Sequence, residues 1–512
     1  MFRKILNKGV DKFRLETLCV LFFCIFGPLY ILLPVFLGRT SLLTSFDDDA
    51  FYYFKIASNI ALGNGSTFNG IYDTNGYHPL WMLILALQWL LSRAFEIDPL
   101  ILVKISIVFF YLLTLRMSAL FCKRYIESDE KLLNLFFTAL TSVFYLYISS
   151  GGMEVVLAIP IIMYLFLLAA QRRPAILITI VFTAAVLSRL DSIIFLAPLM
   201  AFVLFDRWRS KREVSILLAV PSFFISIYLL INYYKFGLLV PVSGIAKSSN
   251  EFVLFSSEAW NSIFIYTNWK RINVFAVLAI PIVGVLIFPR SLSETDRCNS
   301  RLAIAMVGGC FLFYFVTALR SDWPLWPWYF FPMYFLFLAL IVSGSNRTGN
   351  SHQLVLGKIG RLVIVVVSGA YLSYALLSST IDKMLYRPSS IAEAEEISKF
   401  INDHPGIYAM GDRAGMVGYL STSPIIQIEG LVMNKAYLKF MHQNGMTVNK
   451  ILEFYGVNYY INYQVIDVSG CFNGREPIFG KFAILFRICK NPIERLSQGA
   501  NIFHLGEEHF NK

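Results

Sequence analysis

Long apolar runs recur along the first three-quarters of this chain, and they restrict its possible folds more than any other feature. A run of about 20 apolar residues is long enough to cross the ~30 Å hydrocarbon core of a bilayer as a helix. The 512 residues are 57% hydrophobic and 15% charged, whereas soluble domains are about 45–50% apolar and about 25% charged. The sequence therefore predicts a polytopic α-helical membrane protein and excludes a disordered chain.

We predict eleven membrane-spanning helices from these runs. They cover residues 17–38, 99–121, 132–149, 155–170, 175–187, 192–205, 214–231, 272–288, 302–319, 329–342 and 362–379. A twelfth apolar run, residues 79–91, is short for a span. A full crossing, which would give twelve spans, and a re-entrant or interfacial helix therefore both stay open.

The formal net charge of +11 could indicate a nucleic-acid-binding surface, but its distribution along the chain favours another interpretation. With the N-terminus inside and residues 79–91 not crossing, the predicted cytoplasmic segments contain 20 Lys and Arg against 9 Asp and Glu. Because cytoplasmic loops retain basic residues, this surplus orients a multi-pass protein in the cell membrane with a cytoplasmic N-terminus. We expect no nucleic-acid partner. A crossing by residues 79–91 would invert every later assignment.

Residues 381–512 form a polar region in which 13 basic and 13 acidic residues cancel. An odd number of spans places this region outside, so we expect an external α/β domain. The membrane module would then be residues 1–380, with a first external loop at 39–98. The expected helix and strands of the domain cover residues 391–402, 425–428, 459–461 and 482–487. An oxidising compartment would permit a Cys471–Cys489 disulfide, and the sequence leaves that bridge open.

The first external loop contains three consecutive carboxylates, Asp47, Asp48 and Asp49. Three like charges beside a membrane cost repulsion and desolvation that a simple connector does not require, which points to a functional site. The alternative role is electrostatic capping of a following helix, for which one Asp would be enough. Apolar residues recur at three- and four-residue spacing over residues 50–62. This spacing predicts an amphipathic helix lying along the bilayer, with the carboxylates at the water–lipid boundary.

Other polar and aromatic residues are predicted to reach the same external face. His78 precedes the proline that opens the next helix, from where its ring could contact a phosphate or a metal. Glu154, Arg189 and Lys247 fall at external ends of predicted spans, and Trp328 belongs to a stretch with three tryptophans. Snorkelling anchors and an aromatic belt are the structural alternatives for these residues. The sequence contains no Walker, dinucleotide-binding or zinc motif.

The loop resembles that of the GT-C superfamily of integral-membrane glycosyltransferases, which use polyprenyl-phosphate-linked sugars. It is similar to loops of arabinofuranosyltransferase-like and protein-mannosyltransferase-like members. The matching residues are Asp48-Asp49-Ala50-Phe51-Tyr52-Tyr53, Gly63-Asn64-Gly65-Ser66-Thr67-Phe68 and Thr74-Asn75-Gly76-Tyr77-His78-Pro79-Leu80-Trp81. Segments that look like those of bacterial relatives are Gly152-Met153-Glu154, Arg189-Leu190-Asp191 and Trp328-Tyr329-Phe330. The resemblance implies a GT-C-like fold over most of residues 40–335.

The resemblance also implies transfer of a sugar from a polyprenyl-phosphate donor to an acceptor hydroxyl on the external face, with inversion. A carboxylate, Asp48 first and Asp49 as the alternative, would take the proton of the acceptor hydroxyl. A cation would stabilise the charge that develops on the leaving lipid phosphate. The candidates for this cation are, in order, Lys247, Arg189 and His78.

Tyr53, Glu154 and Trp328 complete the predicted substrate-binding residues. Asp49 or Glu154 could instead hold a divalent cation through oxygen ligands. No metal is assigned, because members of the superfamily differ in their need for one. The acceptor could be a glycan, a lipid or a protein, and the surrounding membrane lipids are further partners.

Two other classes of function are weighed against the transferase. A transporter or flippase of lipid-linked saccharides predicts charges at mid-membrane depth and internal symmetry. The sequence offers only Lys104 and Arg116 as interior candidates and shows no repeat. A scaffold or binding protein would instead act through the external domain alone.

Overall fold

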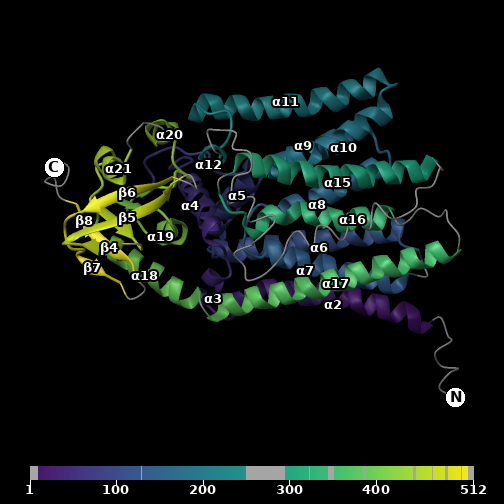
Figure 1. The fold of residues 1–512 in the computed structure, drawn as a ribbon, viewed down its shortest axis with the longest axis horizontal. Coiled ribbons are helices and arrows are strands. Elements are labelled where there is room, and N and C mark those ends of the chain that lie inside the picture. Colours follow the sequence, from purple (N-terminus) through teal and green to yellow (C-terminus); the bar gives the residue numbers. More distant parts are fainter. Residues whose placement is uncertain are drawn as a thin grey trace, which may run out of the picture.

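The fold consists of a bundle of long helices with a smaller mixed domain at one end (Figure 1). The computed structural model describes residues 10–127, 130–248, 294–321, 323–343, 351–385, 387–441, 446–463, 465–478, 482–496 and 499–505. The bundle helices run roughly along the long axis of the molecule, and the strands of the C-terminal domain cluster beyond their ends.

The predicted spans correspond to helices wherever the chain is described. The bundle consists of α2 (Val10–Phe36), α6 (Pro99–Tyr125), α7 (Lys131–Ser149), α8 (Val155–Ala170), α9 (Ala175–Ser188), α10 (Ser192–Arg207), α11 (Lys211–Phe236), α15 (Glu294–Arg320), α16 (Phe331–Ser343) and α17 (Ser351–Leu385). Five helices in this described part are long and apolar enough to cross a membrane, and five more are shorter apolar helices. The predicted span at residues 272–288 lies outside the described residues. The short run at 79–91 is part of α5 (Pro79–Phe95).

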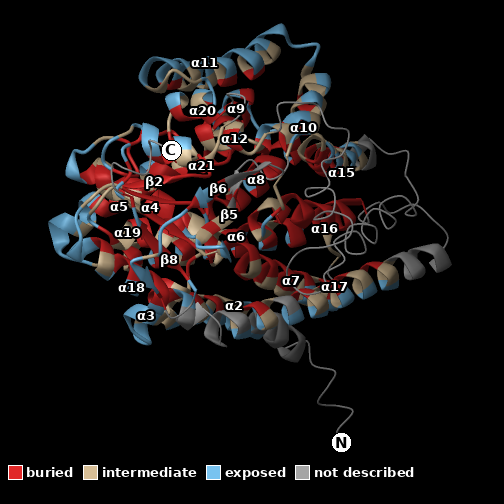
Figure 2. Ribbon diagram, turned by 60° about the vertical axis from the view of Figure 1, so that its left-hand side comes forward, coloured by how far each residue is buried: buried red, intermediate tan, exposed pale blue. Residues whose placement is uncertain are grey.

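The bundle has a buried centre and an exposed, apolar exterior. Every residue of α16 is buried, whereas α11 buries only Leu217, Pro221 and Asn232, a contrast visible in Figure 2. Large apolar side chains such as Phe223 and Leu230 are 61% and 63% exposed on α11. Extended apolar exposure of this kind is unfavourable in water and favourable against lipid. The chain is a membrane protein.

The segment predicted as the first external loop, residues 39–98, folds into α3 (Arg39–Thr44), α4 (Asp48–Leu62) and α5. The predicted amphipathic helix is confirmed as α4, but its apolar face does not lie on the bilayer. Phe51 and Phe54 are fully buried. Their ring centroids lie 5.5 and 6.3 Å from that of Tyr419 in the C-terminal domain. The protein itself covers this face, so α4 is packed between the bundle and the C-terminal domain.

The C-terminal domain combines helices with two sheets. Its helices are α18 (Arg387–Asp403), α19 (Ala414–Leu420), α20 (Lys435–Met441) and α21 (Val448–Phe454). Its strands are β1 (Tyr408–Met410), β2 (Ile425–Gln427), β3 (Tyr459–Asn462), β4 (Val465–Val468), β5 (Cys471–Ile478), β6 (Phe482–Ile488), β7 (Glu494–Arg495) and β8 (Asn501–His504). The five-stranded sheet has the order β2-β1-β3-β8-β7, and the three-stranded sheet has the order β4-β5-β6. The three strands and the helix expected from the sequence are all present.

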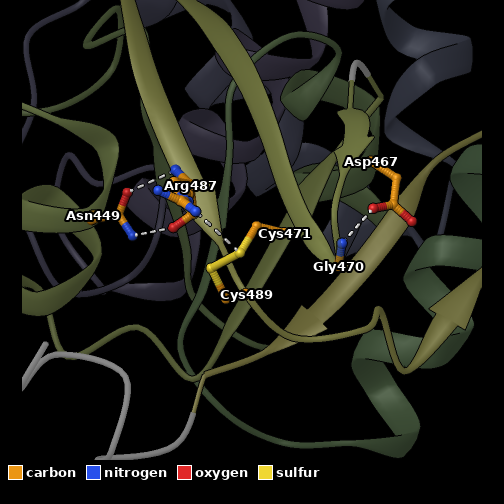
Figure 3. Close-up of a disulfide and its surroundings, with 6 residues drawn as sticks. All are labelled: Asn449, Asp467, Gly470, Cys471, Arg487 and Cys489. Carbon is orange, nitrogen blue, oxygen red and sulfur yellow. Dashed lines mark hydrogen bonds between the residues drawn. A yellow bond between two sulfur atoms is a disulfide. The ribbon is translucent and has the colours of Figure 1, made fainter.

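A disulfide joins Cys471 to Cys489, so the bridge that the sequence left open is formed (Figure 3). It connects the first residue of β5 to the residue after β6. The neighbouring backbone is held as well, because the Asn449 side chain donates to the Arg487 carbonyl and accepts from its N–H. Disulfides persist in oxidising compartments, which agrees with the expectation that this domain is external.

Candidate active site

The three carboxylates at the start of α4 point to three different places. The Asp47 carboxylate packs against Gly151, where an added Cβ would clash with it, and the Asp47 backbone N–H donates to the Gly151 carbonyl at 3.0 Å. Asp48 faces the C-terminal domain, where its two carboxylate oxygens accept the backbone N–H groups of Gly415 and Met416 at 3.0 and 2.9 Å. Asp49 lines a cavity, and its Oδ2 lies 3.9 Å from Nζ of Lys247. An α-helix turns about 100° per residue, so adjacent carboxylates cannot share one direction.

The cavity has a volume of about 620 Å³ and is formed where the helical bundle meets the first loop and the C-terminal domain. Its charged and titratable lining residues include Asp49, His78, Glu154, Arg189, Asp191, Lys247 and Arg320. Its apolar lining residues on α10, α11 and α15 include Ile193, Ile194, Ile225, Leu229 and Val316. The cavity therefore joins a charged interior to the apolar flanks of bundle helices.

Glu154 is the centre of a buried network. Its residue is 1% exposed, and its Oε1 accepts from Nη1 of Arg189 at 2.5 Å. Its Oε2 accepts from the Tyr53 hydroxyl at 3.2 Å, and Nε2 of His78 lies 3.6 Å from Oε1. A buried carboxylate is tolerated only when it is paired and hydrogen-bonded, and Glu154 meets both conditions.

Arg189 is committed to neighbouring carboxylates. Besides Glu154, it donates from Nε and Nη2 to the two oxygens of Asp191 at 2.8 and 2.9 Å. Its guanidinium also lies over the Tyr329 ring, 4.7 Å from the centroid. Burial disfavours the charge of Arg189, but Asp191 and Glu154 outweigh this effect and raise the pKa of the guanidinium. These contacts make Arg189 a structural cation, which weakens its candidacy as a phosphate ligand.

His78 is held in one tautomer. Its Nδ1 accepts the backbone N–H of Leu190 at 3.1 Å, so the proton of the neutral ring sits on Nε2, which faces Glu154. Its own backbone N–H donates to the Tyr53 hydroxyl at 3.2 Å. Burial lowers the pKa of the His78 ring despite the nearby carboxylates of Glu154 and Asp191. A neutral His78 can donate one hydrogen bond, but it supplies little charge for a phosphate.

Lys247 follows α12 (Val242–Ala246) and points its ammonium group into the cavity. The ammonium lies 5.9 Å from the Trp323 ring centroid and 5.8 Å from that of Tyr329. Burial disfavours its charge, but Tyr329, Asp49 and Glu154 raise its pKa. Lys247 therefore stays cationic at neutral pH.

For the Asp49 carboxyl group, the effect of burial on the pKa outweighs that of the neighbouring cation. Burial raises its pKa, and Asp47 and Glu154 add to the rise, while the Lys247 ammonium lowers it. A carboxylate with a raised pKa is a stronger base than an exposed Asp. Burial also raises the pKa of Asp48 to about 7 against the effect of its two N–H donors.

Seven of the eight predicted site residues line this one cavity: Asp49, Tyr53, His78, Glu154, Arg189, Lys247 and Trp328. The eighth, Asp48, is absent from the cavity lining in the described chain, and both of its oxygens are occupied by backbone N–H groups. The geometry therefore does not favour Asp48 as the base and favours the alternative, Asp49.

The structure adds cavity residues that were not among the predicted site residues. Arg320 at the end of α15 lines the cavity, and among the described residues no hydrogen bond or ion pair engages its guanidinium. Its position at a span end was the only signal for it in the sequence. Leu431 and Val432 reach the cavity from the C-terminal domain. No sequence signal marks these two, because they are ordinary apolar residues that only tertiary structure brings to the site.

The residues suggested for a divalent cation do not form a ligand set. Both oxygens of Glu154 are occupied by Arg189 and the Tyr53 hydroxyl, and Asp49 faces a lysine. The described part of the chain holds no group of three or more His, Cys, Asp or Glu side chains arranged to bind a metal. These residues do not fit a bound metal.

The overall fold is similar to that of a protein of known structure. The crystal structure of ArnT from Cupriavidus metallidurans bound to undecaprenyl phosphate matches 82% of this chain and 86% of its own, with 13% identity and a TM-score of 0.50. The apo structure of the same protein matches 80% and 89%, with 13% identity and a TM-score of 0.45. No protein-family model and no curated protein matches the chain. The chain thus shares the fold of ArnT, which confirms the GT-C resemblance at the level of the fold.

Proposed function

We propose that this protein is a glycosyltransferase that moves a sugar from a polyprenyl-phosphate donor to an acceptor hydroxyl on the external membrane face, with inversion. The fold supports this proposal, because ArnT has a crystal structure with undecaprenyl phosphate bound. The observation that carries it is the cavity, in which the Asp49 carboxylate faces the Lys247 ammonium at 3.9 Å between apolar helices. A base and a phosphate-binding cation are the two groups that this chemistry requires.

The donor is proposed to enter from the lipid side. Ile225 and Leu229 of α11 and Ile193 of α10 supply an apolar flank for the prenyl chain. The phosphate would then contact Lys247 and Arg320, which lie at the charged end of the same cavity. When the phosphate binds Lys247, it competes with Asp49 for that ammonium and frees the carboxylate for the acceptor.

Asp49 is proposed to act as general base. Its carboxylate takes the proton of the acceptor hydroxyl while the oxygen attacks the anomeric carbon and the carbon–oxygen bond to the phosphate breaks. The bonding electron pair leaves with the phosphate, and Lys247 and Arg320 stabilise its added negative charge. One displacement at the face opposite the leaving group inverts the anomeric configuration. Base assistance of this kind contributes ~10²–10⁴ in rate.

The charge distribution supports a transporter or flippase less than it supports a transferase. Lys104, one of its two interior candidates, donates to the carbonyls of Ser45 and Ser150 at 3.4 and 3.3 Å. It also lies 4.0 Å from the ring centroid of Phe46. These contacts fasten the first loop to the turn between α7 and α8. Arg116, the other candidate, is exposed on α6.

The proposal is tested by replacing the two groups separately in protein reconstituted into lipid nanodiscs. The variants Lys247→Met and Arg320→Met should weaken binding of undecaprenyl phosphate, measured by native mass spectrometry. The variant Asp49→Asn should keep that binding and lose release of undecaprenyl phosphate from undecaprenyl-phosphate-linked sugars by at least ~10²-fold. Wild-type binding by both cation variants would remove the lipid-phosphate assignment.

A further inference from the structure

We infer that the C-terminal domain forms part of the catalytic cavity. Asp48 is the positioning residue that couples this domain to the cavity. This inference rests on the proposed function, because it concerns how Asp49 is held in place. The two adjacent carboxylates then have different tasks: Asp48 binds the domain, and Asp49 faces the substrate.

The contact at Asp48 is close and involves both partners' backbones. The two carboxylate oxygens accept from consecutive N–H groups at the start of α19. A Cβ atom added at Gly415 would lie 2.2 Å from the Asp48 carbonyl oxygen and 2.7 Å from its Oδ2. Glycine is therefore required at residue 415 for α19 to reach the first turn of α4.

The next two turns of α4 continue the same interface. Nζ of Lys55, two turns along α4, donates to the Ser421 carbonyl just after α19 at 2.8 Å. Between these ends, the Tyr419 ring lies 5.5 Å from that of Phe51. Beneath α19, a Cβ atom at Gly418 would lie 2.3 Å from Phe68. Polar contacts at Asp48 and Lys55 and apolar packing between them fix the first two turns of α4 against the domain.

The loop after β2 carries this coupling into the cavity wall. The Gln427 side chain accepts from the Leu431 N–H at 2.9 Å and donates to the Tyr52 hydroxyl of α4 at 3.4 Å. The Leu431 carbonyl oxygen lies so close to Gly76 that a Cβ there would be 2.1 Å away. Leu431 and Val432 line the same cavity as Asp49.

These contacts set the rotation of α4 about its own axis. Asp48 and Asp49 are about 100° apart around the helix, so anchoring Asp48 on α19 directs Asp49 into the cavity. A misplacement of about 1 Å in a reacting group can cost ~10² in rate. Loss of the Asp48 anchor should therefore lower kcat while leaving the phosphate-binding cations in place.

The test compares Gly415→Ala and Asp48→Asn with Gly369→Ala. Gly369 lies on α17, and an added Cβ there would meet nothing within 4 Å. We expect Gly415→Ala to lower kcat by roughly 10²-fold, with unchanged affinity for undecaprenyl phosphate, and Gly369→Ala to behave as wild type. Asp48→Asn should lower kcat without abolishing turnover. It should also speed hydrogen exchange at the amides of Gly415 and Met416, which Asp49→Asn should leave unchanged.

Two results would overturn the inference. One is turnover by Gly415→Ala equal to that of Gly369→Ala. The other is complete loss of turnover in Asp48→Asn with slow exchange still present at Gly415 and Met416, because Asp48 would then be the base. If Gly415→Ala does not fold, Asp48→Asn decides alone: unchanged kcat in this variant would overturn the inference, with undecaprenyl phosphate binding as its folding control. Wild-type turnover by Asp49→Asn would instead contradict the proposed function, and the exchange result would still report on the anchor.

Discussion

Replacing Arg189 by Met should destabilise the protein more than it weakens lipid binding. The guanidinium side chain is 1% exposed, as against 2% for its partner Glu154 and 30% for its partner Asp191. Removing it leaves Asp191 able to recover water but leaves Glu154 buried without its cation. Breaking a buried ion pair in this way costs about 3–5 kcal/mol. We expect a loss of stability near the upper end of this range, because the Glu154 carboxylate is fully enclosed.

The double variant Arg189→Met with Glu154→Gln separates this cost from ordinary side-chain loss. The neutral amide no longer needs a cation, so the double variant should be more stable than the sum of the single changes predicts, by about 1–3 kcal/mol. Denaturant unfolding in detergent micelles, followed by tryptophan fluorescence, measures the coupling. Additive changes would refute the account of Arg189 as a structural cation. So would a large loss of undecaprenyl phosphate affinity without loss of stability, since Arg189 would then be a phosphate ligand.

Three further predictions follow from the described contacts. Lys247 lowers the pKa of Asp49, so Lys247→Met should move the acidic limb of the kcat/KM profile to higher pH, whereas Lys247→Arg should leave it near wild type. Burial raises the pKa of Glu476 from 4.5 to about 7, so its contribution to stability is full below about pH 4.5 and is lost as pH rises through about 7. Thermal unfolding between pH 5 and 8 should show this decline in wild type and less of it in Glu476→Gln. Replacing Cys471 and Cys489 by Ser opens a loop with a sequence separation of 18 and should lower stability by about 3 kcal/mol, measured by denaturant unfolding.

The sequence predicts the helices and most of the cavity because their signals are local. Apolar runs long enough to span a bilayer mark the bundle, and α8 begins and ends where its run does, at Val155–Ala170. Charges at the ends of these runs, such as Glu154 and Lys247, meet in space because consecutive spans alternate in direction. The sequence therefore predicts both the face on which the site lies and most of its members.

The roles of individual residues depend on contacts that no local pattern carries. Asp48 and Asp49 are equivalent in the motif, and only α19, 367 residues further along the chain, distinguishes them. The apolar stripe of α4 likewise fits a helix that lies on a bilayer surface. Only the contact with Tyr419 shows that the protein itself covers this stripe. Arg189 resembles a phosphate ligand in sequence because its second carboxylate, Glu154, is 35 residues away.

In the proposed reaction, Asp49, supported by Lys247, is the base of a sugar transfer from a lipid phosphate. The most direct measurement is the turnover of Asp49→Asn, with undecaprenyl-phosphate-linked sugars as donors and binding of undecaprenyl phosphate as the control. We expect wild-type binding and a loss of turnover of at least ~10²-fold. Turnover near the wild-type rate in a variant that still binds the lipid would contradict it.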